Sequence, residues 1–257
     1  EMLNRHHRTV APLWKNGRLF IPGNDQIFAA DAYNGTLLWN VKLPESRRIA
    51  AFRDCSYMSA SDDHLFAVAG DECHVLNAQT GYAEHVFQVP QKSDRTNSDW
   101  GYVANVKNLL VGSGCRTGAS RREHTRDSIM EAAYFDEQYV VCSDYLFAFD
   151  HVTTGRQWVY EAKTGAIVNS TITIGDGTVF FIESQNVKTL DTENGRNKPV
   201  TLLAGGASLV AIDLQTGNEK WRVDSATTKV QHNLYVAYSS SNVITVGSRN
   251  SGTDKTT

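Results

Sequence analysis

A short motif recurs along the chain at wide intervals and constrains the fold more than any other feature. It consists of Ala, Asp two residues later, Gly four residues after the Asp, and Trp four residues after the Gly. Two copies keep this spacing throughout: Ala29, Asp31, Gly35 and Trp39, and then Ala211, Asp213, Gly217 and Trp221. A third copy keeps the Asp-to-Trp distance with its Gly one residue later: Ala148, Asp150, Gly155 and Trp158. Such repetition indicates an architecture of similar packed units rather than a particular reaction.

A fourth, degraded copy contains Asn77 and Gly81 but has His85 at the position of the Trp. Each copy predicts a strand, a tight turn and a second strand. The Asp or Asn side chain can bond backbone amides within the turn, and the Gly can adopt a positive φ. A Trp at a fixed place in each unit is expected to bury about 150–250 Å². The small Ala two residues before the Asp leaves room for its ring.

Further strands precede these corners, each with its own polar turn. They are predicted at 16–21, 63–68 and 138–142. The similar segment 176–182 has no clear corner directly after it, unless 190–195 is a degraded copy. Repeated small antiparallel sheets of this kind are expected to be arranged radially, as the blades of a propeller.

The repeated motif resembles the tryptophan-docking motif of PQQ-binding-like, quinoprotein-type propellers. This repeat family also includes outer-membrane assembly-factor propellers that bind no quinone. The resemblance extends over nearly the whole chain and implies an all-β propeller of four-stranded antiparallel blades. It also implies that Trp39, Trp158 and Trp221 pack between blades. Because the motif holds blades together, it carries little information about a ligand.

The 257 residues correspond to about five or six blades at about 40–45 residues per blade. Quinoprotein-like propellers usually close with more blades, so we expect residues 1–257 to form one PQQ-like domain that is part of a larger propeller. A complete, smaller propeller with long loops is the alternative. The net charge of −3 does not favour nucleic acid as a partner, and no apolar run approaches the length of a membrane span.

Two stretches, at about 91–135 and 185–206, are predicted to be insertions into the propeller. The first includes a Gly- and Ser-containing segment rich in basic side chains, which are Arg116, Arg121, Arg122, His124 and Arg126. Guanidinium groups and backbone amides in such a loop are suited to a carboxylate or phosphate. These residues are therefore the candidate ligand-binding site. The alternative is a solvated basic loop partly neutralised by Glu123 and Asp127.

Three other candidate sites have weaker support from the sequence. Glu183 and Asn186 could supply two oxygen ligands to calcium, although turn capping is the alternative. The His pair in the basic run 5–8 could bind a metal or face the propeller channel, with a solvated strand as the alternative. Arg53 and Asp54 could line a ligand face, with a surface ion pair as the alternative. The cysteines contain no CxxC pair, so free thiols and one disulfide both remain open for Cys55, Cys73, Cys115 and Cys142.

No motif for nucleophilic catalysis is present, since no Gly-x-Ser-x-Gly sequence occurs. Quinone enzymes of the similar family often carry an adjacent Cys pair, which this chain lacks, and a Trp beneath the quinone. Trp100 lies in the first insertion and could face such a pocket. We therefore expect a non-catalytic binding or scaffolding propeller for a protein or small anionic ligand. The alternative is a PQQ- and calcium-dependent alcohol or sugar dehydrogenase.

The cofactor and the metal stay unassigned by the sequence. By resemblance to the family, the protein is expected to be periplasmic or exported, and further domains can accompany such propellers. No signal peptide is visible at the N-terminus.

Overall fold

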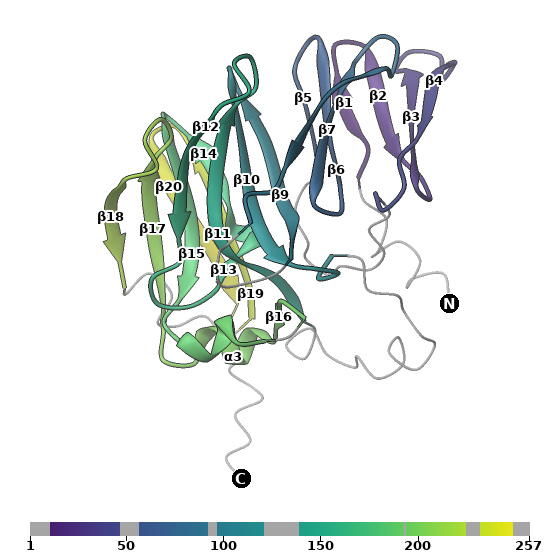
Figure 1. Cartoon of the computed structure of the whole chain (residues 1–257). Helices are drawn as coiled ribbons and strands as arrows, with labels where there is room; N and C mark the ends of the chain where they lie inside the picture. Colours follow the sequence, from purple (N-terminus) through teal and green to yellow (C-terminus); the bar gives the residue numbers. More distant parts are fainter. Residues whose placement is uncertain are drawn as a thin grey trace.

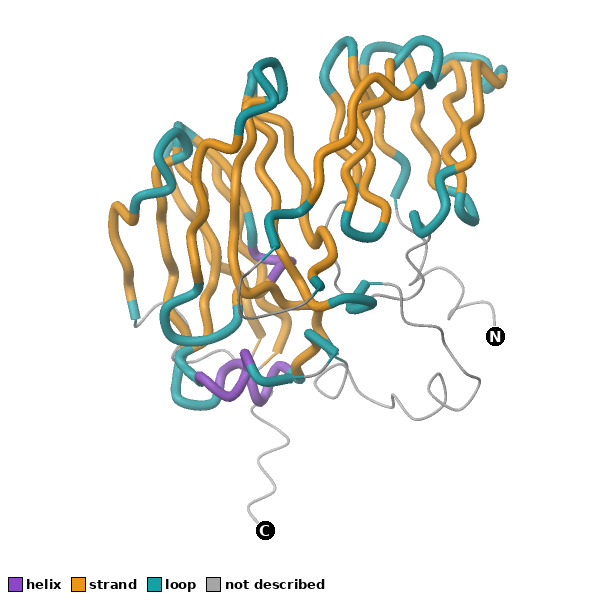
Figure 2. Tube along the Cα trace, in the orientation of Figure 1, coloured by secondary structure: helices purple, strands orange, loops and turns teal. Residues whose placement is uncertain are grey.

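The computed structural model describes residues 11–46, 57–91, 97–120, 139–192, 194–224 and 232–248. These residues form successive antiparallel sheets that stand side by side, each connected to the next along the chain (Figure 1). Strands make up most of the described chain, and helix is confined to short segments (Figure 2). The predicted all-β propeller architecture is therefore confirmed.

The first two blades are four-stranded sheets with the strands in chain order. The first blade contains β1 (Leu13–Lys15), β2 (Arg18–Pro22), β3 (Gln26–Asp31) and β4 (Leu37–Lys42). The second blade contains β5 (Met58–Ala60), β6 (His64–Ala69), β7 (Glu72–Asn77) and β8 (Ala83–Gln88).

The third and fourth blades are joined into one hydrogen-bonded sheet. The third contains β9 (Ser98–Val106), β10 (Leu109–Arg116), β11 (Val140–Asp150) and β12 (Arg156–Glu161). The fourth contains β14 (Thr173–Gly175), β15 (Thr178–Ser184), β17 (Ala207–Asp213) and β18 (Glu219–Val223). The short strand β13 (Ile167–Val168) connects them, because it pairs with both β11 and β15.

A two-stranded hairpin, β19 (His232–Ser239) and β20 (Asn242–Ser248), follows the fourth blade. The remaining elements are the 3₁₀ turns η1 (Asn169–Thr171) and η2 (Val187–Leu190), strand β16 (Arg196–Asn197) and helix α3 (Pro199–Leu203). The number of blades in the whole propeller stays a prediction.

The predicted boundaries of the first insertion need correction. Strands β9 and β10 lie inside the range 91–135, yet they are the first two strands of the third blade, because β9 pairs with β10 and β10 pairs with β11. Residues 117–139 connect β10 to β11, and of these the structure describes 117–120 and 139. The sequence did not show this because β10 and its neighbour β11 are far apart along the chain.

The segment 176–182, which had no clear corner directly after it in the sequence, pairs with the strand that leads into the Asp213 corner. Strand β15 pairs with β17 from Thr178↔Asp213 to Ser184↔Ala207, so the Asp213 corner belongs to this blade. The stretch 185–206 separates the two strands, and the suspected degraded corner at 190–195 instead begins where η2 ends. The second predicted insertion thus lies between the second and third strands of the fourth blade.

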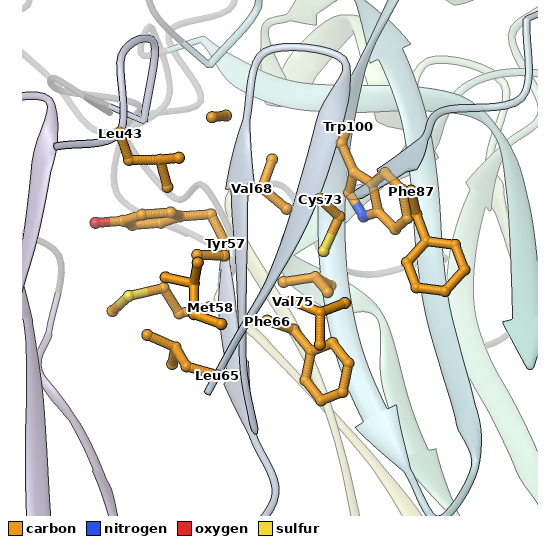
Figure 3. Packing of buried hydrophobic residues seen from close by; sticks show 14 of the residues in the cluster. Leu43, Tyr57, Met58, Leu65, Phe66, Val68, Cys73, Val75, Phe87 and Trp100 are labelled. Carbon is orange, nitrogen blue, oxygen red and sulfur yellow. The ribbon is translucent and has the colours of Figure 1, made fainter. Parts of the chain in front are cut away.

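The largest hydrophobic core extends over the first three blades. It includes Phe20 of the first blade, Phe66 and Phe87 of the second, and Trp100 and Phe147 of the third. Figure 3 shows the part of this core around the second blade, with Trp100 close to Phe87. Trp100 is fully buried and stands edge-on to Phe147, with ring centroids 4.8 Å apart. Its position in the core leaves it no role as the floor of an open ligand pocket.

Candidate functional site

The repeated corners have the local structure that their residue types predict. Asp31 Oδ1 accepts hydrogen bonds from the amides of Tyr33 (2.8 Å) and Asn34 (3.1 Å), and Gly35 has a φ of +74°. The other corners repeat these bonds with Asn77, Asp150 and Asp213 as acceptors. Each motif Ala lies opposite the motif Trp on the next strand, as Ala29↔Trp39, Ala148↔Trp158 and Ala211↔Trp221.

Trp39 crosses from the first blade to the corner of the second. Its Nε1 donates to the carbonyl oxygen of Ala78 at 3.1 Å, and its side chain is buried. The ring lies against Gly81, where an added Cβ would come within 2.8 Å of ring atoms. Gly81 is therefore required both by its φ of +76° and by the space that the indole occupies.

Trp158 repeats this contact between the third and fourth blades. Its Nε1 donates to the carbonyl oxygen of Leu214 at 2.9 Å. A Cβ on Gly217 would lie 2.7 Å from the ring. The two contacts use equivalent atoms, so the motif acts as an inter-blade dock at these two joints.

The joint between the second and third blades lacks both partners of this dock. His85 replaces the Trp, and Thr154 occupies the left-handed position of the next corner with a φ of +62°, while Gly155 follows it. A Thr side chain is compatible with this corner because no indole arrives there. The loss of the Trp and the displacement of the Gly, which were separate irregularities in the sequence, belong to one joint.

Trp221 differs from the other two motif tryptophans. Its side chain is 39% exposed and rests beside Phe180, with ring centroids 5.8 Å apart. No following corner receives it within the described residues. An inter-blade role for Trp221 therefore stays a prediction.

The described ends of both insertions lie at the same end of their blades. Each connects the second strand of its blade to the third, and successive antiparallel strands bring equivalent connections to the same end. In the first two blades this connection is a tight turn, 23–25 and 70–71, whereas it is 117–139 and 185–206 in the next two. Figure 1 shows β16 and α3 at this end, below the strands. We call the described parts of these two connections the insertion face.

The two insertions are held together at their bases. Strand β16 pairs with the start of β11, as Val140↔Asn197 and Val141↔Arg196. Arg196 Nε also donates to the carbonyl oxygen of Ala119 in the first insertion. The backbone of Cys142 adds a bond to Gly195, 3.0 Å long. The insertion face is thus built on a hydrogen-bonded base that is shared by two blades.

Arg116 contributes to this base. Its guanidinium NH2 donates to the carbonyl oxygen of Leu190 at 2.7 Å, and its Nε lies 3.7 Å from a carboxylate oxygen of Asp144. The side chain is only one-quarter exposed. The other candidate ligand-binding residues, Arg121, Arg122, His124 and Arg126, lie outside the described residues. So do Cys55, the basic run 5–8 and the pair 53–54.

Apolar side chains that the sequence analysis did not single out are exposed on the insertion face. Val187 at the start of η2 and Val200 in α3 are each 65% exposed. Tyr139 is partly exposed as well, and Lys198 Nζ lies 5.6 Å from the centre of its ring. For Val187, Lys198 and Val200, only their position in the predicted insertion 185–206 could have drawn attention to them, and Tyr139 lay in a predicted strand.

The suspected calcium pair is not assembled. Glu183 is fully buried, and its carboxylate accepts hydrogen bonds from Tyr160 Oη (2.9 Å) and Arg222 NH2 (3.2 Å). The amides of residues 163 and 164 and the Thr164 hydroxyl bond its other oxygen. Asn186 instead caps η2, and its Nδ2 donates to the Thr201 carbonyl. These two residues therefore do not fit calcium, and the capping alternative describes Asn186.

The Glu183 cluster fastens the third blade to the fourth. Burial and the neighbouring Glu183 carboxylate raise the pKa of Tyr160, because both disfavour a phenolate. Burial alone would lower the pKa of Arg222, but its hydrogen bonds to Glu183 and Glu219 raise it. Tyr160 is therefore neutral and Arg222 charged, which suits a structural ion pair rather than acid–base chemistry.

The described cysteines do not form a reactive or metal-binding group. Cys73 and Cys142 are free, buried thiols, and the buried Cys115 thiol donates to the Asp99 carbonyl at 3.6 Å. Burial raises the pKa of Cys142 to about 12. Within the described ranges, no three His, Cys, Asp or Glu side chains converge as a metal site. Among the same residues, no helix is long and apolar enough to span a membrane.

Solved structures with similar folds include both assembly factors and dehydrogenases. BamB from Moraxella catarrhalis matches with a TM-score of 0.50 and 14% identity over 87% of this chain and 54% of that one. Quinohemoprotein alcohol dehydrogenase from Comamonas testosteroni matches with a TM-score of 0.56 and 15% identity over 84% and 35%. The WD40 domain of Neurospora crassa Pan2 matches with a TM-score of 0.50 and 10% identity over 88% and 54%. At these identities, the likeness concerns the fold.

The chain spans about half of the BamB chain and about a third of the dehydrogenase chain. No curated protein matches it. A family model described as outer membrane protein assembly factor BamB matches residues 2–201, which is most of the sequence. The chain therefore belongs to this family of PQQ-repeat β-propellers.

Proposed function

We propose that this protein is a non-catalytic binding propeller that holds a protein partner on its insertion face. One observation carries the proposal: two neighbouring blades enlarge the same connection, and the two enlargements are bonded to each other at their bases. Blade closure needs only a tight turn there, as the first two blades demonstrate. Long connections on a rigid scaffold are typical places for binding residues.

The chemistry of the insertion face supports a protein as the partner. Val187 and Val200 are exposed apolar side chains, and the Tyr139–Lys198 pair lies on the same two insertions. Of the basic residues proposed to contact the ligand, Arg116 anchors the base. The contact itself is assigned to Arg121, Arg122, His124 and Arg126, whose guanidinium and imidazole groups suit carboxylates of a partner.

The matched family model supports the same class of function, since its description is that of an assembly factor. By this relation we propose a periplasmic or exported location. A quinone- and calcium-dependent oxidoreductase is the second candidate, because dehydrogenases share the fold. It is less favoured because Glu183 and Asn186 are committed to structural bonds.

Site-specific photo-crosslinking in the source cells tests the proposal. A photoreactive residue is placed at Val187 or Val200 on the insertion face. Matched, exposed controls carry it at Tyr33 or Val152, in the Asp31 and Asp150 corners, which we call the corner face. We expect a discrete protein adduct from the insertion face that is absent from the corner face. Adducts only from Tyr33 and Val152, or none from any position in a folded variant, would contradict the proposal.

A further inference from the structure

The side-chain amide of Asn169 is buried without a hydrogen-bond partner. Asn169 begins η1, between β13 and β14, and is fully inaccessible to solvent. Neither its Nδ2 nor its Oδ1 is bonded to any described group. A buried amide without hydrogen bonds is unfavourable.

Two serine hydroxyl groups of the third blade converge on the same place. A Cβ built on Gly101 would lie 2.6 Å from Ser113 Oγ, 2.8 Å from Asn169 Nδ2 and 2.9 Å from Ser143 Oγ. Gly101 comes from β9, Ser113 from β10 and Ser143 from β11, so four separate elements contribute to the cluster. The missing side chain at Gly101 allows these polar groups to approach the backbone.

The serine hydroxyl groups retain unused bonding capacity. Ser143 Oγ and Ser113 Oγ are 2.8 Å apart and share one hydrogen bond, and Ser113 also accepts from the amide of Tyr102 at 2.9 Å. Two hydroxyl groups that share one bond still offer a second hydrogen and further lone pairs. Both serines are fully buried. The cluster therefore offers donors and acceptors but no net charge.

We propose that a water molecule is bound between Asn169 and the Ser113–Ser143 pair and connects the third blade to the start of the fourth. Buried waters generally make two to four hydrogen bonds to polar groups that otherwise lack partners. Water both donates and accepts, as the amide and hydroxyl groups here require. Because Asn169, Ser113 and Ser143 carry no charge, the cluster favours a neutral ligand such as water over an ion. This site is independent of the insertion face.

Water relaxation and crystallography test the site directly in the unaltered protein. Oxygen-17 relaxation dispersion counts long-lived internal waters, and a high-resolution crystal structure locates them. We expect an ordered water within hydrogen-bonding distance of the Asn169 amide and of Ser113 or Ser143. Direct bonds from Asn169 to protein groups with no such water would overturn the proposal.

An Asn169→Leu variant gives a second test, which depends on whether its melting temperature falls or rises. If water satisfies the amide, the substitution removes its bonds, so the melting temperature falls and one long-lived water is lost. If the amide has no ligand, the apolar side chain removes an unfavourable buried group, and the melting temperature rises or stays the same. The second result, with the water count unchanged, would refute the site. Should the variant not fold, the measurement on the unaltered protein decides.

Discussion

At the scale of single residues, the fold depends on contacts between one indole and one glycine. The Trp39 and Trp158 rings leave no space for a side chain at Gly81 and Gly217, and their N–H groups bond equivalent carbonyls. The resemblance of the motif to a known repeat family implied that Trp39 and Trp158 pack between blades. It could not distinguish Trp221, because the spacing of its motif is the same while its surroundings are not.

We predict that Trp158→Ala lowers the free energy of unfolding by about 3–5 kcal/mol, as expected for a buried aromatic side chain. The matched control is Trp221→Ala, at a motif position that is 39% exposed, which should cost clearly less. Denaturant melts of the two variants measure the difference. Equal losses would mean that Trp221 is as deeply docked as Trp158.

The joint between the second and third blades can be tested by restoring its dock. His85→Trp alone should bring an indole against the Thr154 side chain, whereas His85→Trp with Thr154→Gly removes that obstacle. We predict a favourable coupling energy of about 1 kcal/mol between the two substitutions in a double-mutant cycle. Additive effects would indicate that the presence of His85 in place of the Trp and of Thr154 in place of the Gly are unrelated.

Another residue-level prediction concerns the buried ion pair. Glu183→Gln removes the charge that faces Arg222 and should destabilise the protein by about 3–5 kcal/mol, since breaking a buried pair leaves an uncompensated charge. The control is Glu219→Gln, because Glu219 bonds the same guanidinium but is 23% exposed. A larger loss for the control would mean that Glu183 is not the main counter-charge.

At the scale of elements, the sequence predicted the turns within each corner but not the pairing of strands that are distant along the chain. Corners at Asp31 and Asp213 carry their own turn chemistry, so they were visible in the sequence. Strand β10 pairs with β11 across residues 117–139, and β15 pairs with β17 across residues 185–206. Local sequence patterns cannot predict either pairing, because the partner strands are far apart along the chain.

The candidate site was predictable to a similar extent. The two insertions were recognised by their loop-like composition, but exposed Val187 and Val200 depend on how the insertions pack. For Glu183 and Asn186 the structure follows the capping alternative rather than a calcium pair. Glu183 ends a buried strand and faces the neighbouring blade, whereas Asn186 caps the following turn.

At the scale of the whole molecule, the family contains both binding propellers and enzymes, so ligand uptake distinguishes them. A cofactor at about 100 times its dissociation constant should stabilise a binding protein by about 2.7 kcal/mol. We predict no change in melting temperature when PQQ and calcium are added, with a PQQ-dependent dehydrogenase as the positive control. A clear shift would favour the oxidoreductase.

The most direct measurement replaces residues 121–138 with a short Gly/Ser linker. Strands β10 and β11 are paired as far as Cys115↔Ser143, so the ends of this segment can be joined as a hairpin. The variant is compared with the parent protein by thermal melting and by crosslinking from Val200. Our account predicts nearly the parent melting temperature and loss of the protein adduct. An adduct of undiminished yield, or a variant that no longer folds, would contradict the claim that this connection serves binding rather than the fold.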